Sequence, residues 1–229
     1  QAPEKLMTIE PALRDIPGAV GSLEALLDLP AGPPRAVVVL AHPLPTAGGT
    51  MHTKMIFQAA KGLTRSGCAV LRFNFRGVGR SAGTFDEGRG EQDDFRAAVD
   101  YAAARFPGLE IWGGGGSFGA FVGMTASSHD PRVVARIGIA APVNRYDFSE
   151  VLGTVKPTFL VHGEDDELIP LELVREFYAR LEEPKELVVI DSANHLFEGQ
   201  AGEVGDALEE LLGDFLVSTR GGADGSARP

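Results

Sequence analysis

Residues 111–119 read Ile-Trp-Gly-Gly-Gly-Gly-Ser-Phe-Gly, and the small and apolar residues Ala120–Met124 follow them. The stretch predicts a buried strand end, a sharp turn that carries one serine, and the start of a helix. The pattern Gly115-x-Ser117-x-Gly119 matches a nucleophile elbow, in which the serine has a strained backbone and its neighbours must lack bulk. The helix that begins there directs its N–H groups toward an oxygen anion formed when Ser117 attacks a carbonyl.

The same glycines also fit a different class of site. Residues 114–119 contain the G-x-G-x-x-G spacing of a dinucleotide-binding fingerprint, and residues 77–82 contain G-x-G-x-x-A. The first pattern should precede a second strand that ends in an acidic residue, but the strand expected over Arg136–Ala141 is followed by Pro-Val-Asn. The second pattern runs into the polar residues 84–88 and not into an apolar helix. Both patterns therefore fail in context, and a nucleotide-binding oxidoreductase is kept only as the alternative, beside a non-catalytic binding module on the same fold.

Length and composition favour one α/β domain. The chain has 229 residues, of which 44% are hydrophobic, enough for a sizeable core. We expect a single domain over residues 1–218. Residues 219–229 include the run Gly-Gly-Ala-Asp-Gly-Ser and are expected to form a disordered tail.

Charge and hydropathy limit the partners. The net charge is −11 and the sequence pI about 4.9, which argues against nucleic acid or a membrane surface as a partner because both need basic patches. No apolar run reaches the ~18 residues of a transmembrane helix. A cytoplasmic location is the expectation, although a signal peptide removed before Gln1 would leave no trace in this sequence.

Apolar runs alternate with helical patterns along the chain. The expected strands are Lys5–Glu10, Leu23–Leu29, Ala36–Ala41, Ala69–Phe75, Glu110–Trp112, Arg136–Ala141, Thr158–Val161 and Glu186–Ile190. The expected helices are Thr53–Arg65, Gly90–Arg105, Phe118–Ser128, Leu171–Leu181 and Gly202–Val217. Continuous apolar strands indicate burial on both faces, hence a mostly parallel sheet covered by helices. The order predicts a doubly wound α/β fold with an edge hairpin formed by the first two strands.

In such a sheet the working residues gather at the carboxyl ends of the strands. Residues 162–170, His-Gly-Glu-Asp-Asp-Glu-Leu-Ile-Pro, follow one expected strand, and residues 191–197, Asp-Ser-Ala-Asn-His-Leu-Phe, follow the last. Together with Ser117 this edge supplies a serine, a carboxylate and His195. Their order along the chain is the one expected for an α/β-hydrolase triad.

The roles follow from acid–base chemistry. A free hydroxyl is a poor nucleophile at neutral pH, so Ser117 needs a base, for which His195 is the candidate. A carboxylate must hold the second imidazole nitrogen, and Asp166 is preferred because His162-Gly-x-x-Asp166 places it one turn past the strand. Asp165 is the competitor.

An oxyanion hole needs two N–H donors. One is expected from Phe118, the residue after the nucleophile, and the other from Leu44, because Pro43 and Pro45 on either side of it have no N–H.

Other polar residues have plainer interpretations. His42 and His162 lie at strand ends and are expected to brace the loops, whereas His52 and His129 read as surface or helix-end residues. The acidic group Glu91, Asp93 and Asp94 is expected to complement the dipole of the helix at 90–105. Cys68 opens an apolar strand pattern and reads as a buried structural residue.

The motifs spread over residues 42–197 resemble those of a known family. They are His-Pro-x-Pro at 42–45, Leu-Arg-Phe-Asn-Phe-Arg-Gly-Val-Gly-x-Ser-x-Gly at 71–83, Asp-x-Gly-x-Gly-Glu-x-x-Asp at 86–94, Gly-x-Ser-Phe-Gly at 115–119, His-Gly-x-x-Asp at 162–166 and the late His195. The set looks like small, lidless bacterial α/β-hydrolases, which are similar to carboxylesterases and dienelactone-hydrolase-like enzymes. Leu44 stands where this group often has a second histidine, and Gly116 where it often has phenylalanine. Both departures bear on substrate choice.

Residues and resemblance together predict a serine hydrolase. It would cleave short-chain carboxylic esters or thioesters through an acyl-enzyme formed on Ser117. His195 would be the base, and Asp166 would be the carboxylate that holds the imidazole of His195. The substrate is a small molecule, and neither a cofactor nor a metal is expected. Residues Pro142–Pro157 suffice only for a turn of helix and a connector, so the sequence predicts no sizeable lid.

Overall fold

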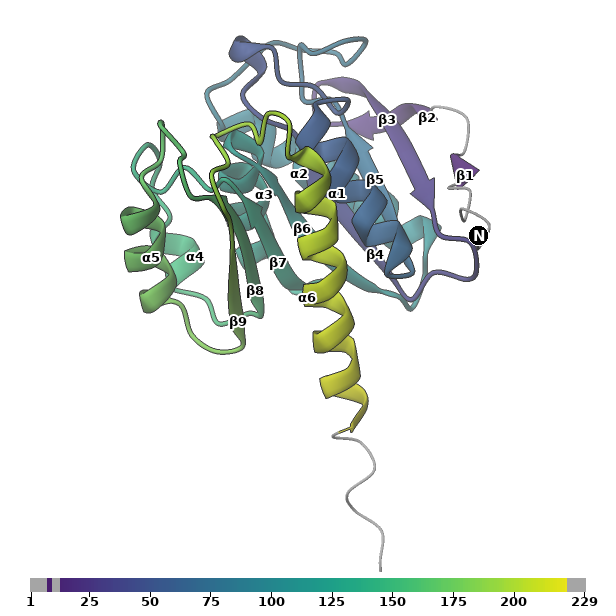
Figure 1. The fold of residues 1–229 in the computed structure, drawn as a ribbon. Helices are drawn as coiled ribbons and strands as arrows, with labels where there is room; N and C mark the ends of the chain where they lie inside the picture. Colours follow the sequence, from purple (N-terminus) through teal and green to yellow (C-terminus); the bar gives the residue numbers. More distant parts are fainter. Residues whose placement is uncertain (1–7, 10–12, 222–229) are drawn as a thin grey trace, which may run out of the picture.

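A computed structural model describes residues 8–9 and 13–221 of the chain. One sheet runs through this part in the order β1-β3-β5-β4-β6-β7-β8-β9, and β2 pairs with β3 (Figure 1). The strands are β1 (Thr8–Ile9), β2 (Leu13–Gly18), β3 (Gly21–Leu29), β4 (Ala36–Ala41), β5 (Cys68–Phe73), β6 (Glu110–Gly116), β7 (Val133–Ile139), β8 (Thr158–Gly163) and β9 (Lys185–Ile190). All neighbours from β5 to β9 in this order are parallel. The mostly parallel sheet predicted from the apolar runs is confirmed.

The edge hairpin differs from the prediction. The hairpin consists of β2 and β3, with Gly18 opposite Gly21. The sequence pattern does not predict a strand at Leu13–Gly18. Pro17 and the polar residues of this segment hide the strand pattern, and proline is tolerated because β2 lies at the sheet edge. Of the expected strand Lys5–Glu10, Thr8 and Ile9 pair with the far end of β3, and the other residues lie outside the described part.

Helices cover both faces of the sheet. They are α1 (Lys54–Arg65), α2 (Arg89–Arg105), α3 (Phe118–His129), α4 (Ser149–Leu152), α5 (Leu171–Arg180) and α6 (Ala201–Gly221), with a 3₁₀ turn at Pro45–Ala47. α1 and α6 pack on the face that includes Val38 and Leu40 of β4. α2 and α3 pack on the opposite face, which includes Val37 and Val39. This alternation along one strand is the burial on both faces that its continuous apolar sequence predicts.

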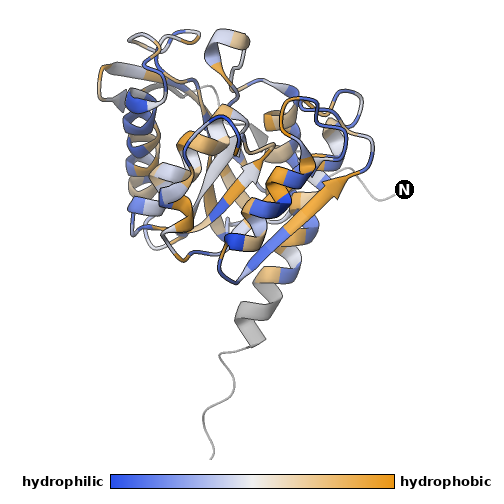
Figure 2. Ribbon diagram, turned by 90° about the vertical axis from the view of Figure 1, so that its left-hand side faces the viewer, coloured by the Kyte–Doolittle hydropathy of each residue, from blue (hydrophilic) through white to orange (hydrophobic). Residues whose placement is uncertain are grey.

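Hydropathy follows this layering. In Figure 2, hydrophobic residues are concentrated on the strands, and hydrophilic residues lie mainly on the outer helices and loops. No helix in residues 8–9 and 13–221 is long and apolar enough to cross a membrane.

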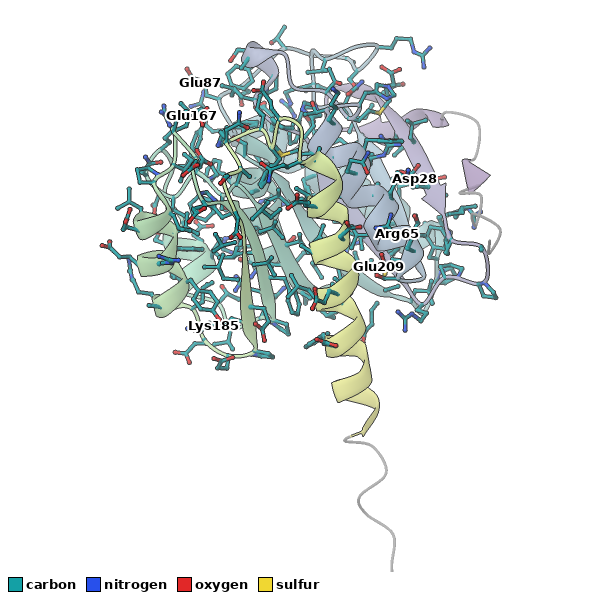
Figure 3. The ribbon with its side chains drawn as sticks, viewed as in Figure 1. Asp28, Arg65, Glu87, Glu167, Lys185 and Glu209 are labelled. Atoms are coloured by element: carbon teal, nitrogen blue, oxygen red, sulfur yellow. The ribbon has the colours of Figure 1, made fainter. Side chains whose placement is uncertain are left out.

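The last helix is longer than expected. α6 continues to Gly221, so three residues of the expected tail are helical, and residues 222–229 lie outside the described part. Arg65 of α1 joins the two helices on this face through ion pairs with Asp206, at 2.8 Å, and Glu209, at 2.6 Å (Figure 3).

The connection between β7 and β8 is short, as predicted. Its one helix, α4, has four residues, so no lid rises over the carboxyl edge of the sheet from this connection. The buried Arg136 secures the connection by donating hydrogen bonds to the carbonyl oxygens of Val151 (2.9 Å) and Thr154 (3.0 Å). Burial lowers the pKa of Arg136 to about 10.

Candidate active site

The serine stands between β6 and α3. β6 runs through all four glycines to Gly116, four residues beyond the expected end at Trp112, because the glycines pair with both β4 and β7 as ordinary strand residues. Ser117 follows at once with φ 49° and ψ −121°, and α3 begins at Phe118. Such a backbone conformation is costly for a residue with a side chain and is typical of functional positions.

Two glycines allow the tight turn. A Cβ on Gly115 or on Gly119 would lie 2.3 Å from the carbonyl oxygen of Ala41, closer than atoms can approach. The turn therefore requires glycine on both sides of Ser117, as the elbow pattern predicts. The dinucleotide-binding alternative finds no phosphate loop here, since Gly114 and Gly116 lie inside β6.

The elbow brings Ser117 to His195, which follows β9. Ser117 Oγ lies 2.8 Å from His195 Nε2, and His195 Nδ1 lies 2.7 Å from Asp166 Oδ2. Because a carboxylate can only accept, Nδ1 carries the hydrogen, which leaves the Nε2 lone pair facing the serine hydroxyl. His195 is 5% exposed, so water has little access to these hydrogen bonds. The three residues predicted from chain order thus meet in one hydrogen-bonded series.

Asp166 is held by its own loop. Its Oδ1 accepts the N–H groups of Leu168, at 2.9 Å, and Ile169, at 2.8 Å. Burial opposes ionisation of Asp166, but the hydrogen bonds from His195 and Ile169 outweigh it, so the pKa of this carboxyl lies below its ordinary value. Asp165, the competitor, has an exposed side chain, and its backbone N–H donates to Ala193. The geometry therefore places Asp166 and not Asp165 against the imidazole.

Leu44 and Phe118 line the same cavity as Ser117 and His195. Among the described residues, no acceptor takes the backbone N–H of either. Neither N–H group is therefore committed to another part of the described chain. A Cβ on Gly116 would lie 2.6 Å from Met55 Sδ of α1, so a larger residue there would require the Met55 side chain to move.

His42 braces the loop that carries Leu44, as expected. Its buried ring donates from Nδ1 to Pro43 O, at 2.7 Å, and accepts at Nε2 from the N–H of Phe75, at 3.1 Å. Burial lowers the pKa of His42 to about 4, only partly opposed by the hydrogen bond to Pro43. The ring is therefore neutral and joins the loops after β4 and β5.

This burial predicts acid sensitivity. An unfolded histidine titrates near pH 6.5, so between about pH 6.5 and 4 the unfolded chain binds a proton at His42 that the folded chain does not. Stability due to His42 is complete above this range and falls by about 3 kcal/mol as the pH drops through it. We therefore measure the free energy of unfolding in urea at pH 7 and at pH 4. Between these two values it should fall by about 3 kcal/mol less in His42→Gln than in the wild type. Parallel declines in both proteins would contradict the prediction.

Two further residues anchor the loop after β4. Asn74 accepts the N–H of Met51 at 2.9 Å, and the Arg72 guanidinium donates to Met51 O at 2.8 Å. Arg72 is itself buried against Asp28, with an N–O distance of 2.6 Å. The motif at 71–83 thus has a structural role that its sequence did not reveal.

The acidic group at the start of α2 is structural, but not only through the helix dipole. Glu91 accepts the N–H groups of Asp86 and Gly88, which caps the helix, and the exposed Asp93 pairs with Arg96. Asp94 is fully buried and pairs with Arg76 at 2.9 Å. The dipole explanation missed this partner, because nothing in a linear sequence connects the two.

The remaining histidines have the expected positions. His52 is exposed, and His129 ends α3, where its Nε2 is hydrogen-bonded to Glu150. Cys68 is buried at the start of β5, and burial raises the pKa of its thiol to about 11.

A cavity of about 300 Å³ opens beside the serine. Its apolar lining includes Pro43, Leu44, Phe118, Pro142, Ile169 and Leu196. Arg145, Tyr146 and Glu167 also line it and were not singled out from the sequence. Figure 3 shows Glu167 near one end of the molecule and Lys185, at the start of β9, near the other, so the cavity lies at the carboxyl end of the parallel strands.

A family model described as serine aminopeptidase S33, a hydrolase family, matches residues 32–155. An uncharacterized protein of Rickettsia prowazekii, RP471, is 32% identical over 206 residues, which cover 85% of this chain and 86% of that protein.

Two solved structures are similar over nearly their whole length. An α/β serine hydrolase without a lid from Xanthomonas campestris, XC6422, is 35% identical with a TM-score of 0.83 and covers 90% of this chain and 94% of its own. An α/β serine hydrolase homologue from Coxiella burnetii is 33% identical with a TM-score of 0.79 and covers 90% and 97%. The resemblance read from the sequence motifs is confirmed.

Proposed function

The chain belongs to the serine aminopeptidase S33 family of hydrolases, and from this premise we propose that it is a serine esterase that cleaves short-chain carboxylic esters or thioesters. One observation carries the proposal. Ser117, His195 and Asp166 form a hydrogen-bonded series that ends in a cavity lined mostly by apolar side chains.

The arrangement suits acyl transfer. His195 Nε2 takes the proton as Ser117 Oγ attacks the carbonyl carbon, and Asp166 stabilises the resulting imidazolium. The N–H groups of Phe118 and Leu44 stabilise the oxyanion, for which each donor is typically worth ~3 kcal/mol. His195 then returns the proton to the departing alcohol or thiol, which leaves the acyl group on Ser117. Water activated by His195 releases the acid in the second half of the cycle.

We propose an ester and not a peptide as the substrate, although the family is described as serine aminopeptidases. An aminopeptidase must bind a free α-amino group, which calls for a carboxylate in the pocket. Glu167 is the carboxylate that lines this cavity among the described residues, and its Oε2 already accepts the N–H of His195 at 3.1 Å. We therefore expect alanine p-nitroanilide to react far more slowly than p-nitrophenyl butyrate.

Two measurements test the proposal. A fluorophosphonate probe labels a serine that is activated by a neighbouring base, so it should label the wild-type protein at Ser117. A panel of p-nitrophenyl and coenzyme A esters then separates esterase from thioesterase activity. An unlabelled, inactive protein would reject the esterase proposal, and faster cleavage of the anilide would replace it with a peptidase.

The open site predicts a preference for short acyl groups. With no lid and a cavity of about 300 Å³, little of a long chain is buried, and each buried CH₂ adds only ~0.8 kcal/mol. We expect kcat/KM for p-nitrophenyl acetate and butyrate to equal or exceed that for the palmitate in detergent-free solution. An emulsion should not activate the enzyme, because no apolar flap has to open. Faster turnover of dissolved palmitate would contradict this prediction.

A further inference from the structure

The buried side chain of His162 lies next to that of Asp166. His162 is the next-to-last residue of β8, is 1% exposed and does not line the cavity. Its Nε2 lies 2.9 Å from the carbonyl oxygen of Ile169 and 3.4 Å from Asp166 Oδ2. Its Nδ1 is buried and has no hydrogen-bond partner among the residues described.

We propose that His162 is a positioning residue for Asp166, which it holds in the orientation that His195 requires. The inference rests on the proposed function. Because the carbonyl of Ile169 can only accept, Nε2 of His162 carries the hydrogen. That N–H is donated to the Ile169 carbonyl, and Nε2 lies 3.4 Å from Asp166 Oδ2, the oxygen that accepts from His195 Nδ1, without forming a hydrogen bond to it.

Two hydrogen bonds of Ile169 hold the end of the loop of residues 163–169. Ile169 donates its N–H to Asp166 Oδ1 at 2.8 Å, and its carbonyl accepts from His162. Without the His162 ring, the Ile169 carbonyl would lose its donor, and the segment that holds Asp166 Oδ1 would be less firmly fixed. Catalytic geometry must be held to about 0.5 Å, so a loosened Asp166 should slow the chemical step.

A histidine at this position carries a cost at Nδ1, because a buried nitrogen without a partner is unfavourable. A phenyl ring would avoid that cost but would leave the Ile169 carbonyl without its donor. The benefit of His162 must therefore lie on its Nε2 side, which faces Asp166 and Ile169.

The ring also leaves the charge of Asp166 available. Burial lowers the pKa of His162, against the opposing effects of the hydrogen bond to Ile169 and of the Asp166 charge. A neutral ring beside Asp166 leaves the negative charge that stabilises the His195 imidazolium.

Three variants separate the two sides of the ring. In His162→Gln the side-chain amide reaches the former Nε2 position, in His162→Asn it reaches the Nδ1 position, and His162→Phe has no donor. We expect kcat for p-nitrophenyl butyrate to fall about 10- to 100-fold in the Phe and Asn variants. The Gln variant should retain most of the activity. KM should be unchanged in all three, because His162 does not line the cavity.

A double-mutant cycle gives the decisive reading. If His162 acts through Asp166, then His162→Phe made in Asp166→Asn should change kcat by no more than roughly twofold. An equal loss in both backgrounds would overturn the inference, as would full activity in the Phe variant or a Gln variant as slow as Asn. If the Phe variant does not fold, the Gln and Asn pair decides. A wild-type protein that hydrolyses no ester would instead reject the proposed function.

Discussion

Replacing Ser117 with alanine is expected to lower kcat for p-nitrophenyl butyrate by about 10⁶-fold, the loss that follows removal of a serine nucleophile. Alanine keeps the Cβ, so the unusual backbone at φ 49° is no more strained than before. The hydroxyl makes its side-chain hydrogen bond to His195, which can bind water in its place. The variant should therefore fold normally and fail to react with a fluorophosphonate.

A matched control separates this loss from a general effect of replacing serine. Ser22 is exposed on β3 and does not line the cavity, so Ser22→Ala should keep full activity and labelling. Circular dichroism and thermal unfolding should be alike for both variants and the wild type. Labelling that persists in Ser117→Ala would show that a different residue is the nucleophile.

The second large effect is expected from Asp166→Asn, with a loss of about 10⁴-fold in kcat. An asparagine can still accept the N–H groups of Leu168 and Ile169 through its oxygen. Its NH₂ group then faces His195 Nδ1 and can only donate, which forces the hydrogen of the imidazole onto Nε2. A ring in that tautomer cannot take the proton of Ser117.

Asp165→Asn is the matched control, since it makes the same chemical change one residue away. The side chain of Asp165 is exposed, and its backbone N–H to Ala193 is untouched by the substitution. Surface changes of this kind have small effects, so kcat should stay within roughly twofold of the wild type. Equal modest losses in the two variants would mean that neither carboxylate holds His195.

The sequence by itself determined the fold class and the serine. The continuous apolar runs predicted a sheet buried on both faces, and the Gly115-x-Ser117-x-Gly119 spacing predicted a strand-to-helix turn. Both are local properties, since apolar periodicity reports burial and a turn without bulky neighbours admits only small residues. The sequence also predicted that Ser117 and His195 lie at one edge of the sheet, because the carboxyl ends of parallel strands lie on the same side.

Local pattern was insufficient wherever a pairing joins distant segments. Leu13–Gly18 contains a proline and charged residues, so only its register against β3 makes it a strand. The glycines of β6 have low intrinsic preference for strands, and their pairing with β4 and β7 overrides it.

The acid of the site was likewise decided by tertiary structure. Asp165 and Asp166 are adjacent acids after the same strand, and the spacing from His162 could only favour Asp166 over Asp165. Asp166 faces His195 while its Oδ1 accepts two N–H groups of its own loop, and the Ile169 carbonyl of that loop accepts from His162. These contacts depend on the pairing of β8 with β9, which no periodicity along the chain predicts. The sequence therefore determined which edge of the sheet holds the chemistry, whereas non-local hydrogen bonds decided which side chain at that edge meets the imidazole.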